Sequence, residues 1–77
     1  MVELLEFLAR ALVDDPEAVS VDQFEEDDGT LVLELTVAEN DMGKVIGRGG
    51  RTIAALRQVV RAVATRHGRR VLVDVVD

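Results

Sequence analysis

The chain of 77 residues contains no cysteine, tryptophan or tyrosine, and its only aromatic side chains are Phe7 and Phe24. The lack of cysteine excludes a disulfide scaffold and a thiolate zinc site, and it fits a reducing cytoplasm. The scarcity of rings argues against surfaces that stack bases on aromatic side chains, such as those of RRM and OB folds. A chain of this length buries only about 60–65% of its unfolded surface. We therefore expect one domain, residues 1–77, around a small aliphatic core.

Long apolar runs and enzyme signatures are also missing. No apolar run approaches the roughly 18 residues that a membrane-spanning helix needs, and Glu3 and Glu6 interrupt the first apolar residues, unlike in a signal peptide. Gly43-Lys44 lacks the upstream glycine spacing of a Walker motif, and Thr52 stands where a dinucleotide fingerprint would need its last glycine. The sequence therefore predicts a cytoplasmic protein without a membrane span, an enzymatic activity, a cofactor or a metal site.

The net charge of −6 conceals a strong asymmetry along the chain. Residues 1–41 contain thirteen acidic residues and one basic residue, Arg10, whereas residues 42–73 contain eight basic residues and no acidic one. Such an asymmetry is typical of a chain that binds nucleic acid or a membrane surface. A solvated, arginine-rich helix face would show the same composition. Because the acid-free stretch is so long, we favour a polyanionic partner.

The spacing of apolar residues predicts the order α-β-β-α-α-β. Leucines recur at helical spacing near the N-terminus, and the apolar Leu31, Leu33, Leu35 and Val37 alternate with residues that include Glu34 and Thr36, as in a half-buried strand. The expected elements are a helix at 2–13, strands at about 18–25 and 31–37, helices at about 41–46 and 51–67, and a strand at 71–75. Asp28-Gly29 is a hairpin turn signal, and the broken alternation at Phe24 suggests a β-bulge. Asn40 or Asp41 is expected to cap the short helix.

This order limits the topology to a small mixed sheet. The hairpin makes the first two strands antiparallel neighbours. The passage through two helices to the third strand is a crossover, which should be right-handed and should leave those strands parallel. We therefore expect an α+β fold, with a three-stranded mixed sheet and the helices packed on one face.

The most informative motif is a glycine loop between the second and third helices. Gly47 and Gly50 are separated by two residues, and three basic side chains surround them: Lys44, Arg48 and Arg51. Glycine lets a backbone approach a ligand closely. A helix that begins at Gly50 or Arg51 would direct free N–H groups and a positive dipole end at the same place. These features predict a phosphate-binding loop, although a plain helix–helix turn would also use glycine.

The stretch Val45-Ile46-Gly47-Arg48-Gly49-Gly50-Arg51-Thr52-Ile53 resembles the signature of the KH domain, whose GxxG loop joins two helices and clamps a nucleic-acid backbone. The element order resembles the type II form of this domain, and residues 39–57 resemble the small single-domain bacterial KH proteins called KhpA. The resemblance covers essentially the whole chain. It implies binding of single-stranded RNA in the cytoplasm, RNA-chaperone activity, and a homodimer or a heteromer with a second KH protein, KhpB. It also implies a role in cell shape and cell-wall homeostasis.

The RNA-binding residues expected from this resemblance lie in and beside the loop. They are Lys44, Val45, Ile46, Gly47, Arg48, Gly49, Gly50, Arg51, Ile53 and Arg57. Val45, Ile46 and Ile53 would form the aliphatic wall of a base-binding groove, but each could equally belong to the core, and helical phase favours the core for Ile53. Arg57 and Arg61 share a helix face, where they could extend a phosphate track or pair with acids. The alternative function is a protein-interaction subunit of a ribonucleoprotein complex, docked through the apolar N-terminal helix and the acidic half, with weak or indirect RNA contact.

Overall fold

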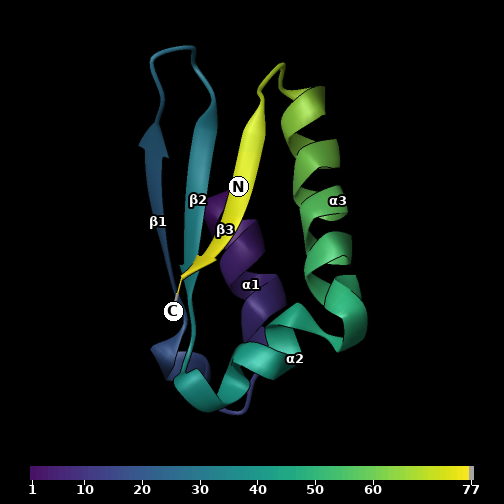
Figure 1. Cartoon of the computed structure of the whole chain (residues 1–77). Helices are drawn as coiled ribbons and strands as arrows, with labels where there is room; N and C mark the ends of the chain where they lie inside the picture. The colour runs from purple at the N-terminus through teal and green to yellow at the C-terminus, as the bar shows by residue number, and fades with distance from the viewer. Residues whose placement is uncertain (77) are drawn as a thin grey trace.

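The computed structural model describes residues 1–76, and its elements follow the expected order (Figure 1). The helices are α1 (Val2–Leu12), α2 (Met42–Ile46) and α3 (Arg51–Arg66), and the strands are β1 (Ser20–Glu25), β2 (Leu31–Thr36) and β3 (Val71–Val76). Short 3₁₀-helices occupy Pro16–Ala18, Glu39–Asp41 and Arg48–Gly50. The boundaries lie close to those expected, because each element carries its own apolar periodicity.

The three strands form one mixed sheet in the order β1-β2-β3. β1 and β2 are antiparallel, and β2 and β3 are parallel, as the hairpin signal and the crossover predict. The register is continuous past Phe24, which lies opposite Val32, so the bulge expected there is wrong. Phe24 breaks the apolar alternation because its side chain points to the opposite face of the strand from that of Val21.

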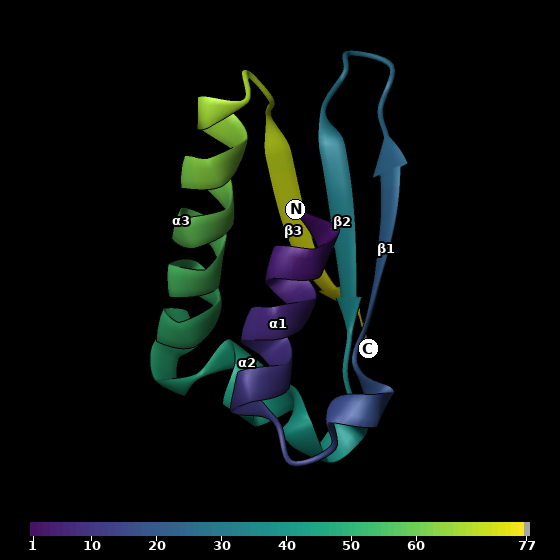
Figure 2. The same ribbon diagram turned by 180° about the vertical axis from the view of Figure 1, so that it is seen from behind.

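The helices lie on one face of the sheet, as expected. α1 passes behind the sheet in Figure 1 and in front of it in Figure 2, while α3 runs alongside β3. Every layer contributes completely buried side chains to the core between them. These include Leu5 from α1, Leu33 and Leu35 from β2, Val45 from α2 and Val60 from α3. Burial of each such side chain stabilises the fold by about 1.5–3 kcal/mol.

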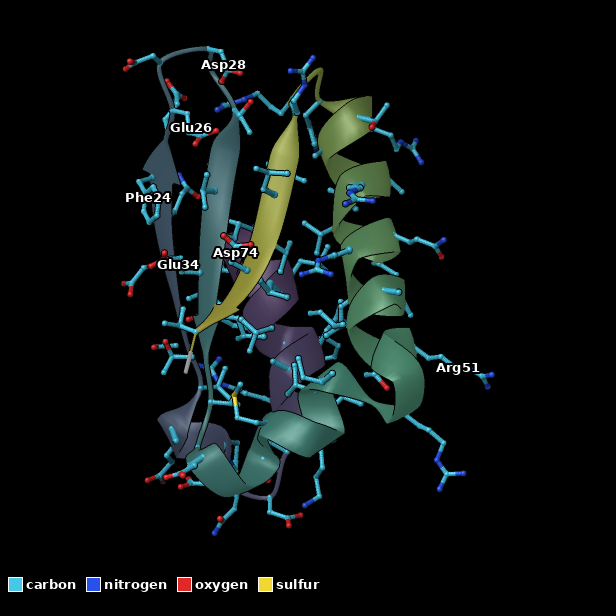
Figure 3. All side chains as sticks on the ribbon, in the orientation of Figure 1. Phe24, Glu26, Asp28, Glu34, Arg51 and Asp74 are labelled. Atoms are coloured by element: carbon cyan, nitrogen blue, oxygen red, sulfur yellow. The ribbon has the colours of Figure 1, made fainter. Side chains whose placement is uncertain are left out.

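The opposite face of the sheet is not covered by any element of residues 1–76. Side chains cross it in two rows that are in register, one apolar and one acidic. The rows are Phe24, Val32 and Leu72, and Asp22, Glu34 and Asp74 (Figure 3). Phe24 and Leu72 are 47% and 43% exposed and shield Val32, which is 5% exposed. Carboxylates directly opposite one another repel, so this face is unsuited to a polyanion.

A buried carboxylate ties the segment after α1 to the start of α2. Asp41 is 2% exposed, and its two oxygens accept hydrogen bonds from the N–H groups of Asp14 at 3.1 Å and Asp15 at 3.0 Å. The Asp14 N–H, helped by that of Asp15, lowers the pKa of Asp41, because both bonds stabilise the charged form. Asp41 is the N-cap residue of α2 by position, but its side chain makes no capping hydrogen bond to the backbone of that helix, so the side-chain cap expected there is wrong. The carboxylate instead anchors the helix that leads into the glycine loop.

Candidate nucleic-acid interface

The glycine loop turns sharply between α2 and α3. Gly47 has φ +78° and ψ 168°, a conformation that is open essentially to glycine alone. A Cβ atom at this position would collide with Thr52, and it would lie only 2.7 Å from the backbone nitrogen of that residue. The Gly47 N–H donates to the Gly43 carbonyl at 2.9 Å and ends α2. Gly47 is therefore needed for the geometry of the loop, whatever the ligand.

Gly49 and Gly50 form the outward-facing part of the loop. Their φ values are +64° and +76°, but an added Cβ would meet no atom within 4 Å at either position. A ligand backbone therefore has space to approach them. Two N–H groups that we expected to be free are used inside the turn, since Gly50 donates to the Gly47 carbonyl at 3.1 Å and Arg51 donates to that of Arg48. The loop consequently depends more on side-chain charge than on backbone donors.

The charged side chains around the loop fall into two groups. Arg48 and Arg51 are exposed, and no carboxylate of residues 1–76 forms an ion pair with either of them. Arg51 extends away from the protein at the start of α3 (Figure 3). By contrast, Lys44 Nζ lies 2.9 Å from Asp14 Oδ2 and 3.5 Å from Asp41 Oδ1. Asp14, through a hydrogen bond and its charge, raises the pKa of Lys44, so this lysine is largely neutralised by the protein itself.

The aliphatic wall expected beside the loop belongs mainly to the core. Ile53 is 5% exposed, which confirms the core interpretation favoured by its helical phase, and Val45 is completely buried. Val45 cannot line a surface groove, because the short helix that carries it packs against α1 and α3. Only Ile46 remains half-buried at the edge of the core. Val45, Ile46 and Ile53 therefore pack in or against the core beneath the loop and hold its two helices in place.

Arg57 has a main-chain partner that the sequence did not indicate, and no carboxylate of residues 1–76 forms an ion pair with it. Its side chain is half-buried, and its Nε donates a hydrogen bond to the carbonyl oxygen of Val73 at 3.0 Å. β3 is an edge strand that pairs only with β2. Arg57 therefore bridges α3 and the unpaired edge of the sheet.

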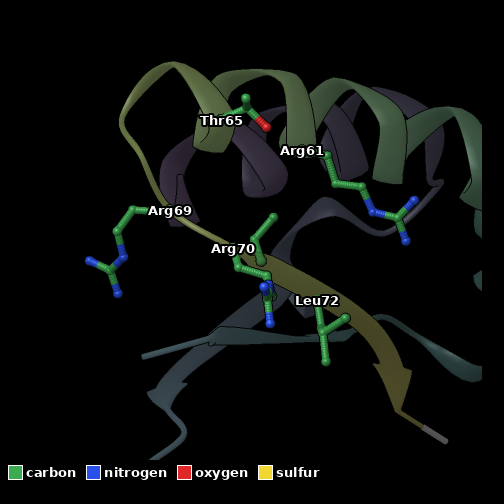
Figure 4. A pocket seen from close by; sticks show the side chains of 6 residues that line it. Arg61, Thr65, Arg69, Arg70 and Leu72 are labelled. Carbon is green, nitrogen blue, oxygen red and sulfur yellow. The ribbon is translucent and has the colours of Figure 1, made fainter. Parts of the chain in front are cut away.

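A cavity of about 350 Å³ lies beyond this bridge, between the C-terminal half of α3 and the start of β3 (Figure 4). Basic and small apolar or hydroxyl side chains line it. They are Arg61, Thr65, Arg69, Arg70, Val71 and Leu72. Sequence reasoning missed Thr65, Val71 and Leu72 as groove residues. The only signal was indirect, because a crossover from α3 into a parallel edge strand leaves the strand beside the helix that precedes it.

The arginines of this cavity differ in their partners. Arg69 lies 2.7 Å from a Glu25 carboxylate oxygen, and Arg70 lies 3.9 Å from one of Asp28. These contacts link the start of β3 to the β1–β2 hairpin, so Arg69 and Arg70 do more than solubilise the chain. Arg61 has no carboxylate partner within the described residues and adds unpaired positive charge to the cavity.

A second cavity, of about 300 Å³, lies between α1 and α3 and is almost entirely apolar. Its lining residues come from one side of each helix. They are Leu8, Ala11, Leu12, Thr52, Ala55, Leu56 and Val59. Leu12 and Val59 are 38% and 45% exposed. This hollow lies on the other side of α3 from the Arg57 bridge.

Comparison with known proteins decides the family. The family model described as KhpA/KhpB, KH domain, matches residues 2–75. The chain belongs to this family. It is 54% identical to RNA-binding protein KhpA of Halalkalibacterium halodurans, over the full length of both chains. It is 43% identical to the protein of the same name from Caldanaerobacter subterraneus, over 99% of this chain and 100% of the other, and 39% identical to that of Chlamydia trachomatis, over 100% and 97%.

Solved structures show the same fold in a larger protein. The crystal structure of Era in complex with MgGDPNP and nucleotides 1506–1542 of 16S ribosomal RNA superposes with a TM-score of 0.61 and 22% identity. The match covers 96% of this chain and 28% of the Era chain. The KhpA/KhpB family thus has a type II KH fold, and it is not a family of enzymes. Within residues 1–76, no helix has both the length and the apolar character needed to cross a membrane.

Proposed function

We propose that this KH domain binds single-stranded RNA, holding the backbone at the loop and the bases in the groove between α3 and β3. One observation carries the proposal: the open glycine loop at the start of α3 carries two exposed arginines, Arg48 and Arg51, with which no carboxylate of residues 1–76 pairs, and the Arg61 cavity lies further along the same helix. The names of the curated relatives support RNA as the ligand. The acidic row leaves the uncovered sheet face unsuitable, so the binding is one-sided.

Backbone recognition would come from the outer half of the loop. Arg48 and Arg51 would each contact a phosphate, and the bare backbone at Gly49 and Gly50 would let the strand approach. Neutralising two phosphates of a single strand gives a slope of about −1.4 in a plot of log affinity against log salt concentration. Lys44 would add little, because Asp14 and Asp41 already balance its charge. Binding by one such domain is therefore expected to be weak.

The groove has room for a short stretch of bases. From Arg51 to Thr65, α3 extends about 21 Å at its 1.5 Å rise per residue, which suits the roughly four nucleotides that a KH domain holds. The Arg57 bridge and the Arg61 cavity lie along this path. Family membership further supports RNA-chaperone activity in the cytoplasm, and a role in cell shape and cell-wall homeostasis together with a KhpB-like partner. A weak and reversible grip suits a chaperone, which has to release its RNA.

The test is a pair of double substitutions with the same change in charge. In Arg48→Asp with Gly49→Asp, the loop loses one positive charge and gains two negative charges, and aspartate tolerates the positive φ of Gly49. The matched control is Arg66→Asp with Gly68→Asp, because Gly68 also has positive φ, at +69°, and open surroundings. Fluorescence anisotropy with a labelled mixed-sequence RNA should show a loss of about tenfold or more for the loop variant and a smaller loss for the control. Equal affinities in two variants that circular dichroism shows to be folded would refute the loop as the binding site.

The apolar cavity between α1 and α3 supports a second role, docking of a protein partner. Phe7 on α1 is 70% exposed, and the hollow beside α3 is lined by aliphatic side chains. A second copy or a KhpB-like protein are the candidates that the family suggests. Val59→Asp should abolish association in light scattering after size exclusion, while RNA affinity per chain at saturating protein should persist. If RNA crosslinking disappears when the partner is removed, the RNA contact is indirect.

A further inference from the structure

The unpaired edge of β3 directs main-chain groups away from the sheet, on the side from which α3 reaches it through Arg57. The Leu31 N–H donates to the Arg70 carbonyl at 2.9 Å, so Arg70 and every second residue after it face β2. By the alternation of a parallel ladder, residues 71, 73 and 75 then direct their N–H and C=O groups at the unpaired edge. The Val73 side chain is 3% exposed and lies in the core. The core thus fixes the position of this edge relative to α3.

Arg57 changes what this edge offers to a ligand. On its own, Val73 would present one donor and one acceptor side by side. The Arg57 Nε occupies the acceptor, at 3.0 Å. A guanidinium has four further N–H donors and no acceptor, and no carboxylate of residues 1–76 pairs with those of Arg57. The edge at this position therefore presents donors alone.

The same hydrogen bond orients the side chain. A half-buried guanidinium that is held at Nε keeps its plane fixed, so its two Nη groups form a prepared fork. Such a fork donates well to two adjacent acceptors. Guanine carries this pair at O6 and N7, and arginine bound to both is the commonest specific protein–base contact. Adenine presents an amino group where guanine has O6, so an N–H donor of Arg57 would face an N–H donor of the base.

We propose that Arg57 makes the groove select guanine, read at its O6 and N7 atoms. This inference rests on the proposed RNA-binding function and adds a base preference to it. Arg57 follows Arg51 by about 9 Å along α3. Arg57 lies about a third of a turn around the helix from Arg51, on the side of α3 that contacts β3, so a strand held at the loop would place a neighbouring base at this arginine if it passes from the loop towards the edge of β3. The loop supplies affinity without sequence information, and the Arg57 bridge supplies the discrimination.

The experiment uses labelled six-nucleotide uridine RNAs with one central base replaced by guanine, 7-deazaguanine or adenine. The unmodified protein should bind the guanine RNA at least about fivefold more tightly than the adenine RNA, and 7-deazaguanine, which lacks N7, should lose much of that gain. Arg57→Met keeps a long unbranched side chain but releases the Val73 carbonyl, so the preference should move towards adenine. Arg57→Lys keeps the charge and should lose the preference with little loss of overall affinity. Arg61→Met is the control and should weaken all three RNAs equally.

The outcomes separate the two proposals. If the unmodified protein binds guanine and adenine RNAs equally while the loop variant still abolishes binding, Arg57 does not select guanine and the RNA-binding function stands. If Arg57→Met weakens all three RNAs by the same factor, Arg57 is a phosphate contact and the inference is wrong. If none of the RNAs binds, both proposals fail. The comparison of guanine with 7-deazaguanine uses the unmodified protein, so it decides the question even if Arg57→Met does not fold.

Discussion

Replacing Gly47 with alanine should damage this fold far more than replacing the other glycines of the loop. At φ +78° and ψ 168°, a residue with a side chain is strained by about 1–3 kcal/mol. The new methyl group would also collide with Thr52, whose backbone nitrogen would be only 2.7 Å away. Because that neighbour is backbone, the start of α3 has to move, and such overpacking typically costs about 1–3 kcal/mol. We expect a total loss of about 3–5 kcal/mol in the free energy of unfolding.

Two matched variants give the scale for this loss. Gly49→Ala has a left-handed φ of +64° but no atom near the added Cβ, so about 1–2 kcal/mol of backbone strain is expected. Gly43→Ala lies inside α2 with no atom near the added Cβ, and it should stabilise the protein by about 0.5–1 kcal/mol because alanine is the better helix former. This last result would also show that Gly43 is not there to allow close helix packing.

Urea unfolding and thermal unfolding, both followed by circular dichroism at 222 nm, measure the three variants side by side. For a domain of this size, the melting temperature of Gly47→Ala should fall by at least about 12 °C. Adding Thr52→Ala should restore little, because the Thr52 nitrogen and Cβ, both at 2.7 Å, remain. If Gly47→Ala costs no more than Gly49→Ala, the collision with Thr52 has no energetic consequence and the loop is more adaptable than its geometry indicates.

Three further predictions concern stability and pH. The hydrogen bond from the Asp14 N–H holds the pKa of Asp41 below its ordinary value of 3.8. The stability that the Asp41 carboxylate adds is therefore complete above that pH and is lost as the pH falls through the lowered pKa. Asp41→Asn should be less stable at neutral pH, and its urea midpoint should fall less steeply as the pH becomes acidic. The pKa of Lys44 is raised above 10.5. The stability that its charge adds is therefore complete below that pH and is lost as the pH rises through the raised pKa. In Lys44→Met the urea midpoint should fall less steeply at alkaline pH, and an unchanged fall would contradict the ion pair. Leu35→Ala, at a fully buried position, should cost about 2–5 kcal/mol, whereas Leu72→Ala, on the uncovered face, should cost under about 1 kcal/mol by the same urea assay.

The order of elements and the site of the loop could be read from the sequence because both depend on local patterns. The expected alternation matches the second half of β2, where the completely buried Leu33 and Leu35 alternate with the half-buried Glu34 and Thr36, whereas Val32 is buried on the outward face beneath Phe24 and Leu72. The helix that starts at Arg51 follows from its apolar spacing and from the glycines before it. The bulge expected at Phe24 was wrong because this aromatic residue lies on the uncovered face of the sheet, where it interrupts the apolar alternation of the sequence without interrupting the strand pairing.

The contacts of individual charged residues could not be read in this way. Lys44 pairs with Asp14, thirty positions earlier in the chain, and Arg57 bonds to a carbonyl of β3. Both depend on where the crossover brings distant segments, and no local spacing encodes that distance. The same holds for Asp41, which looks like a helix cap from its neighbours and instead binds the backbone after α1.

The acidic row on the uncovered sheet face, opposed to the arginines of the loop and α3, gives the whole molecule an electric dipole moment. Figure 3 shows Asp74 and Glu34 on the sheet and Arg51 at the far edge of the molecule, beyond α3. In the field of a polyanion this dipole experiences a torque that turns the arginines towards the polyanion, even though the net charge of −6 repels the molecule at long range. Because salt screens charges beyond about one Debye length, roughly 8 Å at physiological salt, the charges that face the polyanion count most when the two molecules come close. The acidic face therefore orients the domain, because the polyanion repels this face and attracts the arginine-bearing side.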